Sequence, residues 1–248
     1  MKFYRRLTEI KAISFDLDDT LYSNKPVMQA IEKNMIAYFS GLSIVKPFIS
    51  DQHKLLNGNF WSYFRQQAIL KQPDLAHDVV QVRLVSYQLG FMSLGIAEGI
   101  AKQQATVALE YFIQLRSDFT VPEQSKKSLT NLSEKYPLIA ISNGNVDTKT
   151  LGLSHYFQHI YHAGWQVDGS LLKQKPASDM FALACQQLEI KPSQLLHVGD
   201  CGRADIQGAL RAGCQTAWLS CYDVGKPIAV LPHIELNQLI QLEQLLLS

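Results

Sequence analysis

The sequence predicts an α/β fold: a Rossmann-like parallel sheet core with an inserted helical cap. Short apolar runs that alternate with helical patterns are typical of βαβ units, and they occupy the start of the chain and the part after about residue 120. Between them, helical patterns dominate and strand-like runs are scarce. We therefore expect a split α/β core of residues 1–21 and 120–248 and a helical cap of residues 22–119.

The first strand is expected at residues 12–15, an apolar run that ends immediately before Asp16. The inserted span then carries apolar residues at helical spacing, among them Ile31 and Met35, followed by helical patterns over residues 60–70 and 79–89. We interpret its large apolar side chains as the core of a helical bundle rather than as a platform for a ligand. They include Phe60, Trp61, Tyr63, Phe64, Phe91 and Met92.

The second part of the core is expected to alternate helices and strands. A helix starts at Pro122, a buried strand covers residues 137–142, and Asn143 and Gly144 form the turn that follows it. Further strands are expected at residues 159–163, 194–198 and 214–219, and further helices at residues 180–188, 205–212 and 236–246. This order is typical of a parallel sheet with helical connections.

The composition indicates an ordinary soluble protein. With 248 residues, 47% of them hydrophobic, the chain can bury a large core, and its net charge of +1 argues against a nucleic-acid-binding surface. No apolar run is long enough for a membrane helix or the middle of a signal peptide, so we expect no membrane association and a cytoplasmic location. The cysteines form no C-x-x-C pair, and we expect reduced thiols.

An acidic cluster follows the first strand, because Asp16, Asp18 and Asp19 occupy three of four consecutive positions. Carboxylates this close repel one another unless a cation or a reaction partner organises them. Asp16 stands at the carboxyl end of a predicted parallel strand, where open sheets bind ligands, and Asp18 can reach the same crevice. Such a pair can divide the work, one acid attacking while the other transfers protons. A turn or a helix N-cap is the alternative interpretation.

Further polar residues follow later strands in the same way. Ser142 and Asn143 end the second predicted strand, Lys175 lies in a loop, and Asp200 and Asp205 follow the strand at residues 194–198. Each of these alone is an ordinary turn, loop or helix-start residue. Together with the acidic cluster, in this order and at strand ends, they indicate a single catalytic site.

These segments jointly resemble the motifs of the haloacid dehalogenase superfamily. They are Phe15-Asp16-Leu17-Asp18-Asp19-Thr20-Leu21, Ile141-Ser142-Asn143-Gly144, Lys175-Pro176 and Gly199-Asp200-x-x-x-x-Asp205. The helical insert between the first two motifs resembles the cap of this superfamily. The resemblance implies an enzyme that acts on small-molecule phosphate esters.

The resemblance also implies catalytic roles. Asp16 is the nucleophile, and Asp18 is the acid that protonates the leaving oxygen and then activates water. The substrate phosphate is bound by Ser142, by the backbone amide of Asn143 and by Lys175. Because a phosphate monoester repels an incoming carboxylate, the site must supply positive charge before Asp16 can approach phosphorus.

Mg²⁺ is the implied cofactor, since it prefers oxygen ligands. Its implied ligands are the carboxylates of Asp16 and Asp200 and the backbone carbonyl of Asp18, with Asp205 supporting this set. Many members of the superfamily carry a second acid directly after the last motif's first Asp, where this chain has Cys201. The shares of Asp200 and Asp205 in binding the metal are therefore left open.

The retention of Asp18 and Asp200 favours a phosphomonoesterase over a dehalogenase, because attack on carbon needs neither that second acid nor the metal. We expect hydrolysis through an aspartyl-phosphate on Asp16. A phosphomutase is the nearest alternative enzyme. A binding module with a dead site is disfavoured, because Asp16, Asp18 and Lys175 are all retained.

Three further stretches narrow the resemblance to bacterial phosphatases of riboflavin biosynthesis, which act on 5-amino-6-(5-phospho-D-ribitylamino)uracil and on FMN. They are residues 1–7, 175–180 and 231–235. A broad phosphatase for sugar phosphates, pyridoxal phosphate or nucleotides is the alternative. An aromatic side chain of the insert, such as Trp61 or Phe64, is a candidate to stack on the substrate ring. A monomer is favoured over an oligomer.

Overall fold

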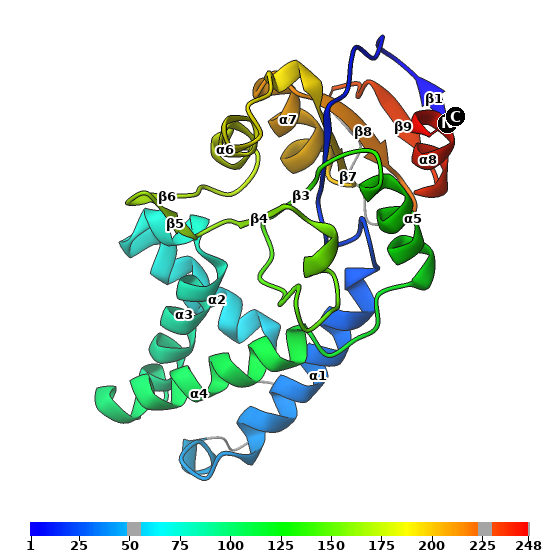
Figure 1. Ribbon diagram of the computed structural model, residues 1–248. Helices are drawn as coiled ribbons and strands as arrows, with labels where there is room; N and C mark the ends of the chain where they lie inside the picture. Colours follow the sequence, from blue (N-terminus) through cyan, green and yellow to red (C-terminus); the bar gives the residue numbers. More distant parts are fainter. Residues whose placement is uncertain (49–55, 223–229, 248) are drawn as a thin grey trace. The chain divides into compact units, whose positions relative to one another are not determined.

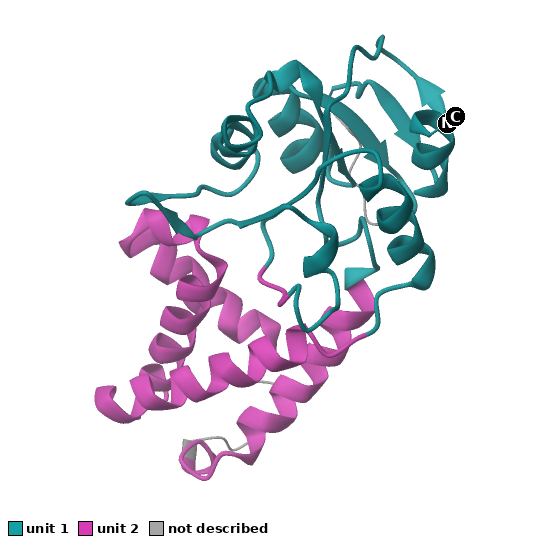
Figure 2. Cartoon of the chain, viewed as in Figure 1, with its two compact units in different colours: residues 1–24, 120–144, 148–248 teal, residues 25–119, 145–147 magenta. Residues whose placement is uncertain are grey.

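A computed structural model of the chain describes residues 1–48, 56–222 and 230–247 (Figure 1). The chain divides into two units, coloured separately in Figure 2. Unit 1 comprises Met1–Asn24, Thr120–Gly144 and Thr148–Ser248, and unit 2 comprises Lys25–Phe119 and Asn145–Asp147. Unit 1 is built on a sheet and unit 2 is built of helices.

The main sheet of unit 1 has, within the described residues, the strand order β1-β9-β8-β7-β2-β3-β4. The strands are β1 (Lys2–Phe3), β2 (Ala12–Phe15), β3 (Leu138–Ser142), β4 (His159–His162), β7 (Leu195–Gly199), β8 (Gln215–Leu219) and β9 (Ile234–Leu236). All neighbours pair in parallel except β1, which runs antiparallel to β9. A separate antiparallel hairpin pairs β5 (Gln166–Val167) with β6 (Ser170–Leu171). The predicted α/β fold with a parallel sheet is confirmed.

The burial of the central strands explains why the sequence predicts them clearly. Every residue of β2, β3 and β7 is buried, as expected for parallel strands covered on both faces, so each is an almost continuous apolar run. From β2 the chain builds β3 and β4 on one side and then crosses to β7 and β8 on the other. The topological switch point therefore lies between β2 and β7, where open sheets bind ligands.

The helices of unit 1 correct two local predictions. They are α5 (Glu123–Ser133), α6 (Asp179–Gln187), α7 (Gly208–Arg211) and α8 (Ile240–Leu246). The helix predicted from residue 236 is wrong at its start, because Ile234–Leu236 form β9, a strand too short to give a periodic pattern. The helix predicted from Asp205 begins instead as a π-helical turn (η5, Gly202–Gln207) that continues into α7.

Unit 2 consists of long helices, as the periodicity of this span predicts. They are α1 (Asn24–Gly41), α2 (Gly58–Lys71), α3 (Val79–Ser93) and α4 (Glu98–Arg116). Asn57 and Asp78 cap the N-termini of α2 and α3, and the side chain of each accepts hydrogen bonds from two backbone amides of the first turn. Across residues 1–48, 56–222 and 230–247, no helix combines the length and the apolarity that a membrane crossing requires.

Aromatic rings form much of the core of unit 2. The Phe39 ring centroid lies 4.4 Å from that of Trp61, 5.3 Å from Tyr87 and 5.8 Å from Phe91. The Trp61 indole N–H donates to the Leu56 carbonyl oxygen at 3.2 Å. The bundle-core interpretation therefore holds for Trp61 and Phe91. It is wrong for two of the predicted core residues, which are exposed: Tyr63 and Met92.

Gly90 of α3 tests how tightly this aromatic core is packed. A Cβ atom at position 90 would overlap the Trp61 ring and lie 3.1 Å from Cε1 of Phe60. We expect Gly90→Ala to lower the free energy of unfolding by about 1–3 kcal/mol, because both rings must shift. Urea unfolding followed by circular dichroism measures this value. Gly99→Ala is the matched control, since a Cβ there meets nothing within 4 Å and Ala favours the helix. Equal destabilisation by both substitutions would contradict the packing argument.

Candidate active site

The predicted site residues gather at the carboxyl ends of three neighbouring strands of unit 1. Asp16 directly follows β2, Ser142 is the last residue of β3, and Asp200 directly follows β7. Because β2 pairs in parallel with both β3 and β7, these strand ends lie at the same edge of the sheet. The Asp16 backbone N–H donates to the Val198 carbonyl oxygen at 2.9 Å, which continues the strand pairing up to the site.

Lys175 joins the acidic groups of the site. Its ammonium donates to Asp16 Oδ1 at 2.7 Å, to Asp205 Oδ1 at 2.6 Å and to the Ile141 carbonyl oxygen at 2.6 Å. These three acceptors use all three ammonium hydrogens. Burial alone would lower the pKa of Lys175, but Asp16 and Asp205 raise it above its ordinary value. Lys175 is therefore a fixed positive charge inside the site.

The turn after β3 is locked to the segment that carries Lys175. The Asn143 side chain donates to the Lys175 carbonyl oxygen at 2.9 Å and accepts from the Lys175 backbone N–H at 2.7 Å. Within the turn, the Gly144 N–H donates to Ser142 Oγ at 3.0 Å. Because the Ser142 oxygen acts here as an acceptor, its hydroxyl hydrogen remains able to donate to a ligand.

Asp205 is enclosed and accepts hydrogen bonds at both carboxylate oxygens. Oδ1 accepts from Lys175 and lies 3.1 Å from His197 Nε2, while Oδ2 accepts from the Cys201 N–H at 2.8 Å. Burial alone would raise the pKa of Asp205, but the Lys175 charge and the His197 hydrogen bond hold it below its ordinary value. The carboxylate is thus ionised and fixed in orientation.

His197 and Ser14 support Asp205 from within the sheet, and neither was expected from the sequence. They are register partners on β7 and β2, and His197 Nδ1 lies 2.9 Å from Ser14 Oγ. Burial lowers the pKa of His197, which favours the neutral ring. The available signal was a polar residue in each of two apolar strands, because buried polar groups need partners. Without the strand register, however, the sequence does not reveal that they pair.

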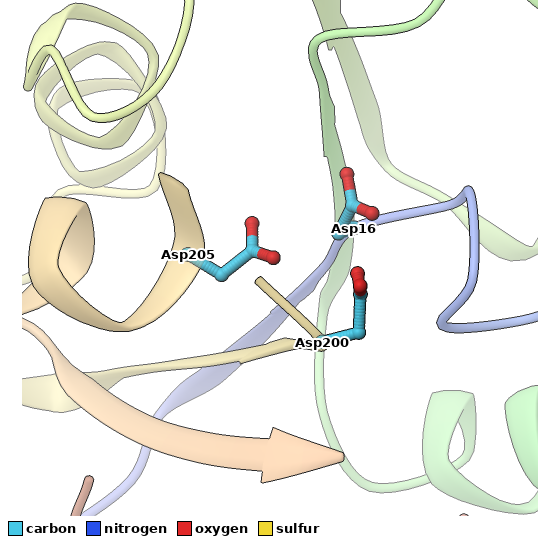
Figure 3. Close-up of side chains that lie close together, drawn as sticks. All are labelled: Asp16, Asp200 and Asp205. Atoms are coloured by element: carbon cyan, nitrogen blue, oxygen red, sulfur yellow. The ribbon is translucent and has the colours of Figure 1, made fainter. Parts of the chain in front are cut away.

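Asp200 completes a cluster of carboxylates. Asp16, Asp200 and Asp205 each offer an oxygen, and these oxygens lie within 4.8 Å of one another (Figure 3). Burial, followed by the charges of Asp205 and Asp19, raises the pKa of Asp200 to about 7, and burial likewise raises the pKa of Asp16. Burial and the neighbouring carboxylates thus disfavour the ionised forms, which a nearby positive charge would favour. A hard divalent cation with oxygen ligands therefore fits this donor set.

The backbone around Asp200 is held by a hydrogen bond that the sequence did not reveal, and it passes close to the Asp205 side chain. The Trp218 indole N–H donates to the Asp200 carbonyl oxygen at 2.7 Å. Gly199, the register partner of Trp218, lies directly under Asp205, and a Cβ atom there would overlap the Asp205 side chain. From the sequence, Trp218 is only a core residue of a predicted strand, so its role depends on the tertiary structure.

Asp18 reaches from the loop after β2 to the turn after β3. The Tyr22 hydroxyl donates to Asp18 Oδ1 at 2.9 Å. Asp18 Oδ2 lies so close to Gly144 that a Cβ atom there would be 2.5 Å from it. A Cβ atom at position 144 would force the Asp18 carboxylate to move, so Gly144 lets the two loops approach each other closely.

Asp19 has the turn role that was the alternative interpretation of the acidic cluster. It adopts a left-handed backbone with φ of +57°, and its N–H donates to the Tyr22 carbonyl oxygen at 2.8 Å. Its Oδ1 accepts from the Asn24 N–H at 2.7 Å, where α1 begins. Asp19 therefore shapes the loop, while Asp16 and Asp18 present carboxylates to the site.

Known proteins similar to this chain cover nearly its whole length. The sequence pattern of the haloacid dehalogenase-like hydrolases matches residues 10–213. The 5-amino-6-(5-phospho-D-ribitylamino)uracil phosphatase YigB of Escherichia coli (strain K12) is 33% identical over 257 residues, covering 99% of this chain and 100% of that protein. The crystal structure of a 2-haloacid dehalogenase from Pseudomonas syringae pv. Tomato DC3000 has a TM-score of 0.83 at 26% identity, covering 96% of this chain and 98% of its own. Magnesium-bound YfnB from Bacillus subtilis shares the fold, with a TM-score of 0.66 at 16% identity over 97% of this chain and all of that chain.

The substitution Lys175→Met tests the buried ion pairs. It leaves Asp16 and Asp205 buried without the ammonium that both contact. Removing one partner of a buried ion pair costs about 3–5 kcal/mol, and we expect the free energy of unfolding at pH 7 to fall by this amount. Urea unfolding provides the measurement. The double substitution Lys175→Met with Asp205→Asn removes one stranded charge and should recover part of the loss. Unchanged stability in the single variant, or no recovery in the double one, would argue against this electrostatic role.

Proposed function

The chain belongs to the haloacid dehalogenase-like hydrolases and is a phosphoric monoester hydrolase, and we propose that it hydrolyses a flavin-pathway phosphate with Mg²⁺ through an aspartyl-phosphate on Asp16. The observation that carries this proposal is the contact of 2.7 Å between the Asp16 carboxylate and the buried Lys175 ammonium. This contact reduces the repulsion between an anionic nucleophile and an anionic ester. Asp18 supplies the second acid that phosphoryl transfer requires.

In the first step, Asp16 attacks phosphorus and the bond between phosphorus and the ester oxygen breaks. Lys175 holds Oδ1 of Asp16, so the attacking atom is Oδ2. Asp18 gives its proton to the leaving oxygen, and the alcohol departs. The phosphoryl group is then an acyl phosphate on Asp16.

In the second step, Asp18 removes a proton from water while the water oxygen attacks phosphorus. The bond between phosphorus and Asp16 breaks, and inorganic phosphate leaves. Tyr22 donates to Oδ1 of Asp18 at 2.9 Å, which helps to hold this carboxylate beside the turn after β3. The same carboxyl group therefore acts as acid in the first step and as base in the second.

The phosphoryl oxygens are bound by the turn after β3. The Ser142 hydroxyl and the Asn143 backbone amide donate to them, where charge must be held in the transition state. Lys175 acts chiefly as a fixed charge, because its three hydrogens already bond to protein oxygens. A direct bond from Lys175 to the phosphoryl group would replace one of these three.

Mg²⁺ would be held by the carboxylates of Asp16 and Asp200 and by the backbone carbonyl of Asp18. When bound, it supplies positive charge that draws the phosphate to Asp16 and stabilises negative charge on its oxygens. We assign Asp205 a supporting role, because both of its oxygens accept hydrogen bonds from protein groups. In this assignment Asp205 keeps Asp200 and Lys175 in position.

The flavin-pathway substrate is supported by the 33% identity with YigB over the full chain. We assign catalysis to unit 1, which contributes every group named above, and propose that unit 2 is the cap that selects the ester. A broad phosphatase for sugar phosphates, pyridoxal phosphate or nucleotides is the alternative substrate assignment. A phosphomutase uses the same first step but returns the phosphoryl group to an alcohol, so it releases almost no phosphate.

The nucleophile is tested by Asp16→Asn with FMN as substrate. We expect the wild type to release one equivalent of inorganic phosphate per riboflavin formed, and the variant to be slower by about 10³-fold or more. A panel that adds the ribitylamino-uracil phosphate, pyridoxal phosphate, sugar phosphates and nucleotides ranks the substrates by kcat/KM. Turnover of the variant at the wild-type rate, or loss of substrate without phosphate release, would refute the mechanism. Circular dichroism of the variant checks that it folds.

The metal assignment is tested by removing Mg²⁺ with EDTA and titrating it back. Activity should disappear and return, and Asp200→Asn should raise the Mg²⁺ concentration for half-maximal activity by at least about tenfold, since a ligand is lost. Asp205→Asn should raise it less, because that side chain supports the site without touching the ion. Calorimetric Mg²⁺ titration of both variants separates binding from catalysis. A larger effect of Asp205→Asn on Mg²⁺ binding would reverse the two roles.

A further inference from the structure

An exposed tryptophan follows the strand next to the phosphate-binding turn. His162 ends β4 and is the register partner of Ser142, the last residue of β3. The chain after His162 therefore leaves the sheet beside the turn that carries Ser142 and Asn143. Trp165 comes three residues later, immediately before the hairpin of β5 and β6 (Figure 1).

The backbone and the ring of Trp165 are both held in place. Its N–H donates to the His162 carbonyl oxygen at 3.2 Å, and its carbonyl oxygen accepts from the Leu172 N–H at 2.9 Å. The indole centroid lies 4.8 Å from that of the His162 ring, with the two planes at 50°. Two backbone hydrogen bonds thus fix the Trp165 backbone, and the buried His162 ring packs against the indole.

His162 links this tryptophan to the phosphate-binding turn. Its ring is buried, and Nδ1 lies 2.8 Å from the Gly144 carbonyl oxygen. Because a carbonyl oxygen can only accept, Nδ1 must carry the hydrogen. Gly144 in turn donates its N–H to Ser142 Oγ. One chain of contacts therefore connects Trp165 to the hydroxyl proposed to bind the phosphate.

Trp165 is nevertheless 49% exposed. By contrast, Trp61 and Trp218 are only partly accessible, and each donates its indole N–H to a backbone carbonyl oxygen. An aromatic side chain that is already fixed loses little conformational entropy when a ligand covers it. Its face favours another planar ring, in a stacked or tilted arrangement.

We propose that Trp165 is a specificity-determining residue that stacks on an aromatic ring of the substrate while the phosphate occupies the Ser142–Asn143 turn. The inference rests on the proposed function, and it deepens it by naming the substrate class: phosphate esters in which a short chain joins the phosphate to a planar heterocycle. It assigns recognition of the ring to unit 1, in addition to any selection by unit 2.

The test compares Trp165→Ala with the wild type on aromatic esters, FMN and pyridoxal phosphate, and on an aliphatic ester, ribitol 5-phosphate. We expect KM for the aromatic esters to rise about fivefold, equivalent to about 1 kcal/mol, with kcat and the aliphatic KM within twofold of the wild type. Trp165→Phe should restore the aromatic KM, because Phe also stacks. Phe3→Ala is the matched control, since Phe3 is 59% exposed on β1, at the opposite edge of the sheet from β4.

Riboflavin, which has no phosphate, provides a readout independent of catalysis. It should quench tryptophan emission of the wild type and of Phe3→Ala, and the quenching should disappear in Trp165→Phe. Equal changes of KM for aromatic and aliphatic esters, or unchanged quenching in Trp165→Phe, would overturn the inference. Failure of the proposed function has a different signature: the wild type itself would not release phosphate from flavin esters. Pyridoxal phosphate and the riboflavin titration would then still decide the role of Trp165.

Discussion

The buried ammonium of Lys175 is the constraint on which the rest of the site depends. It draws together the end of β2 through Asp16, the end of β3 through Ile141 and the turn after β7 through Asp205, which are far apart in the sequence. A buried charge is costly unless it is paired and fully hydrogen-bonded, and here each of its hydrogens has an acceptor. These contacts fix Lys175, and they orient Asp16, the proposed nucleophile, before a substrate binds.

This arrangement is supported from the interior of the sheet rather than from flexible loops. Ser14 of β2 lies beside the His197 ring of β7, and the other ring nitrogen of His197 lies beside Asp205. Asp205 in turn accepts a hydrogen bond from Lys175. Gly199 leaves the space that the Asp205 side chain fills. Buried polar residues lower the apolar content of the core, and their value lies in the positions they fix. A carboxylate supported in this way can orient neighbouring ligands without binding the metal itself.

Strand ends and helical periodicity were sufficient to predict the α/β core, the long helices in the described part of residues 22–119, and the strands next to which Asp16, Ser142 and Asp200 lie. These features are local, because buried parallel strands are continuous apolar runs and the acids assigned to catalysis follow them directly. The missed features depend on register and long-range pairing. His197 matters because Ser14 lies opposite, Trp218 because Asp200 lies within reach, and β9 because β8 pairs with it. The exposure of Tyr63 and Met92 likewise depends on how helices pack, which their spacing alone does not fix.

The similarity to a 2-haloacid dehalogenase, with a TM-score of 0.83, shows how little the fold alone determines the reaction. A carboxylate at the end of β2 can attack carbon or phosphorus, so Asp16 does not decide between them. Phosphorus chemistry adds two demands: a second acid for the leaving oxygen, and enough positive charge for a dianionic ester. We assign the first to Asp18, and the second to Lys175 together with the cation proposed at Asp16 and Asp200. In this proposal the choice of reaction rests on Asp18 and on the charges around Asp16, all of which can change while the sheet stays the same.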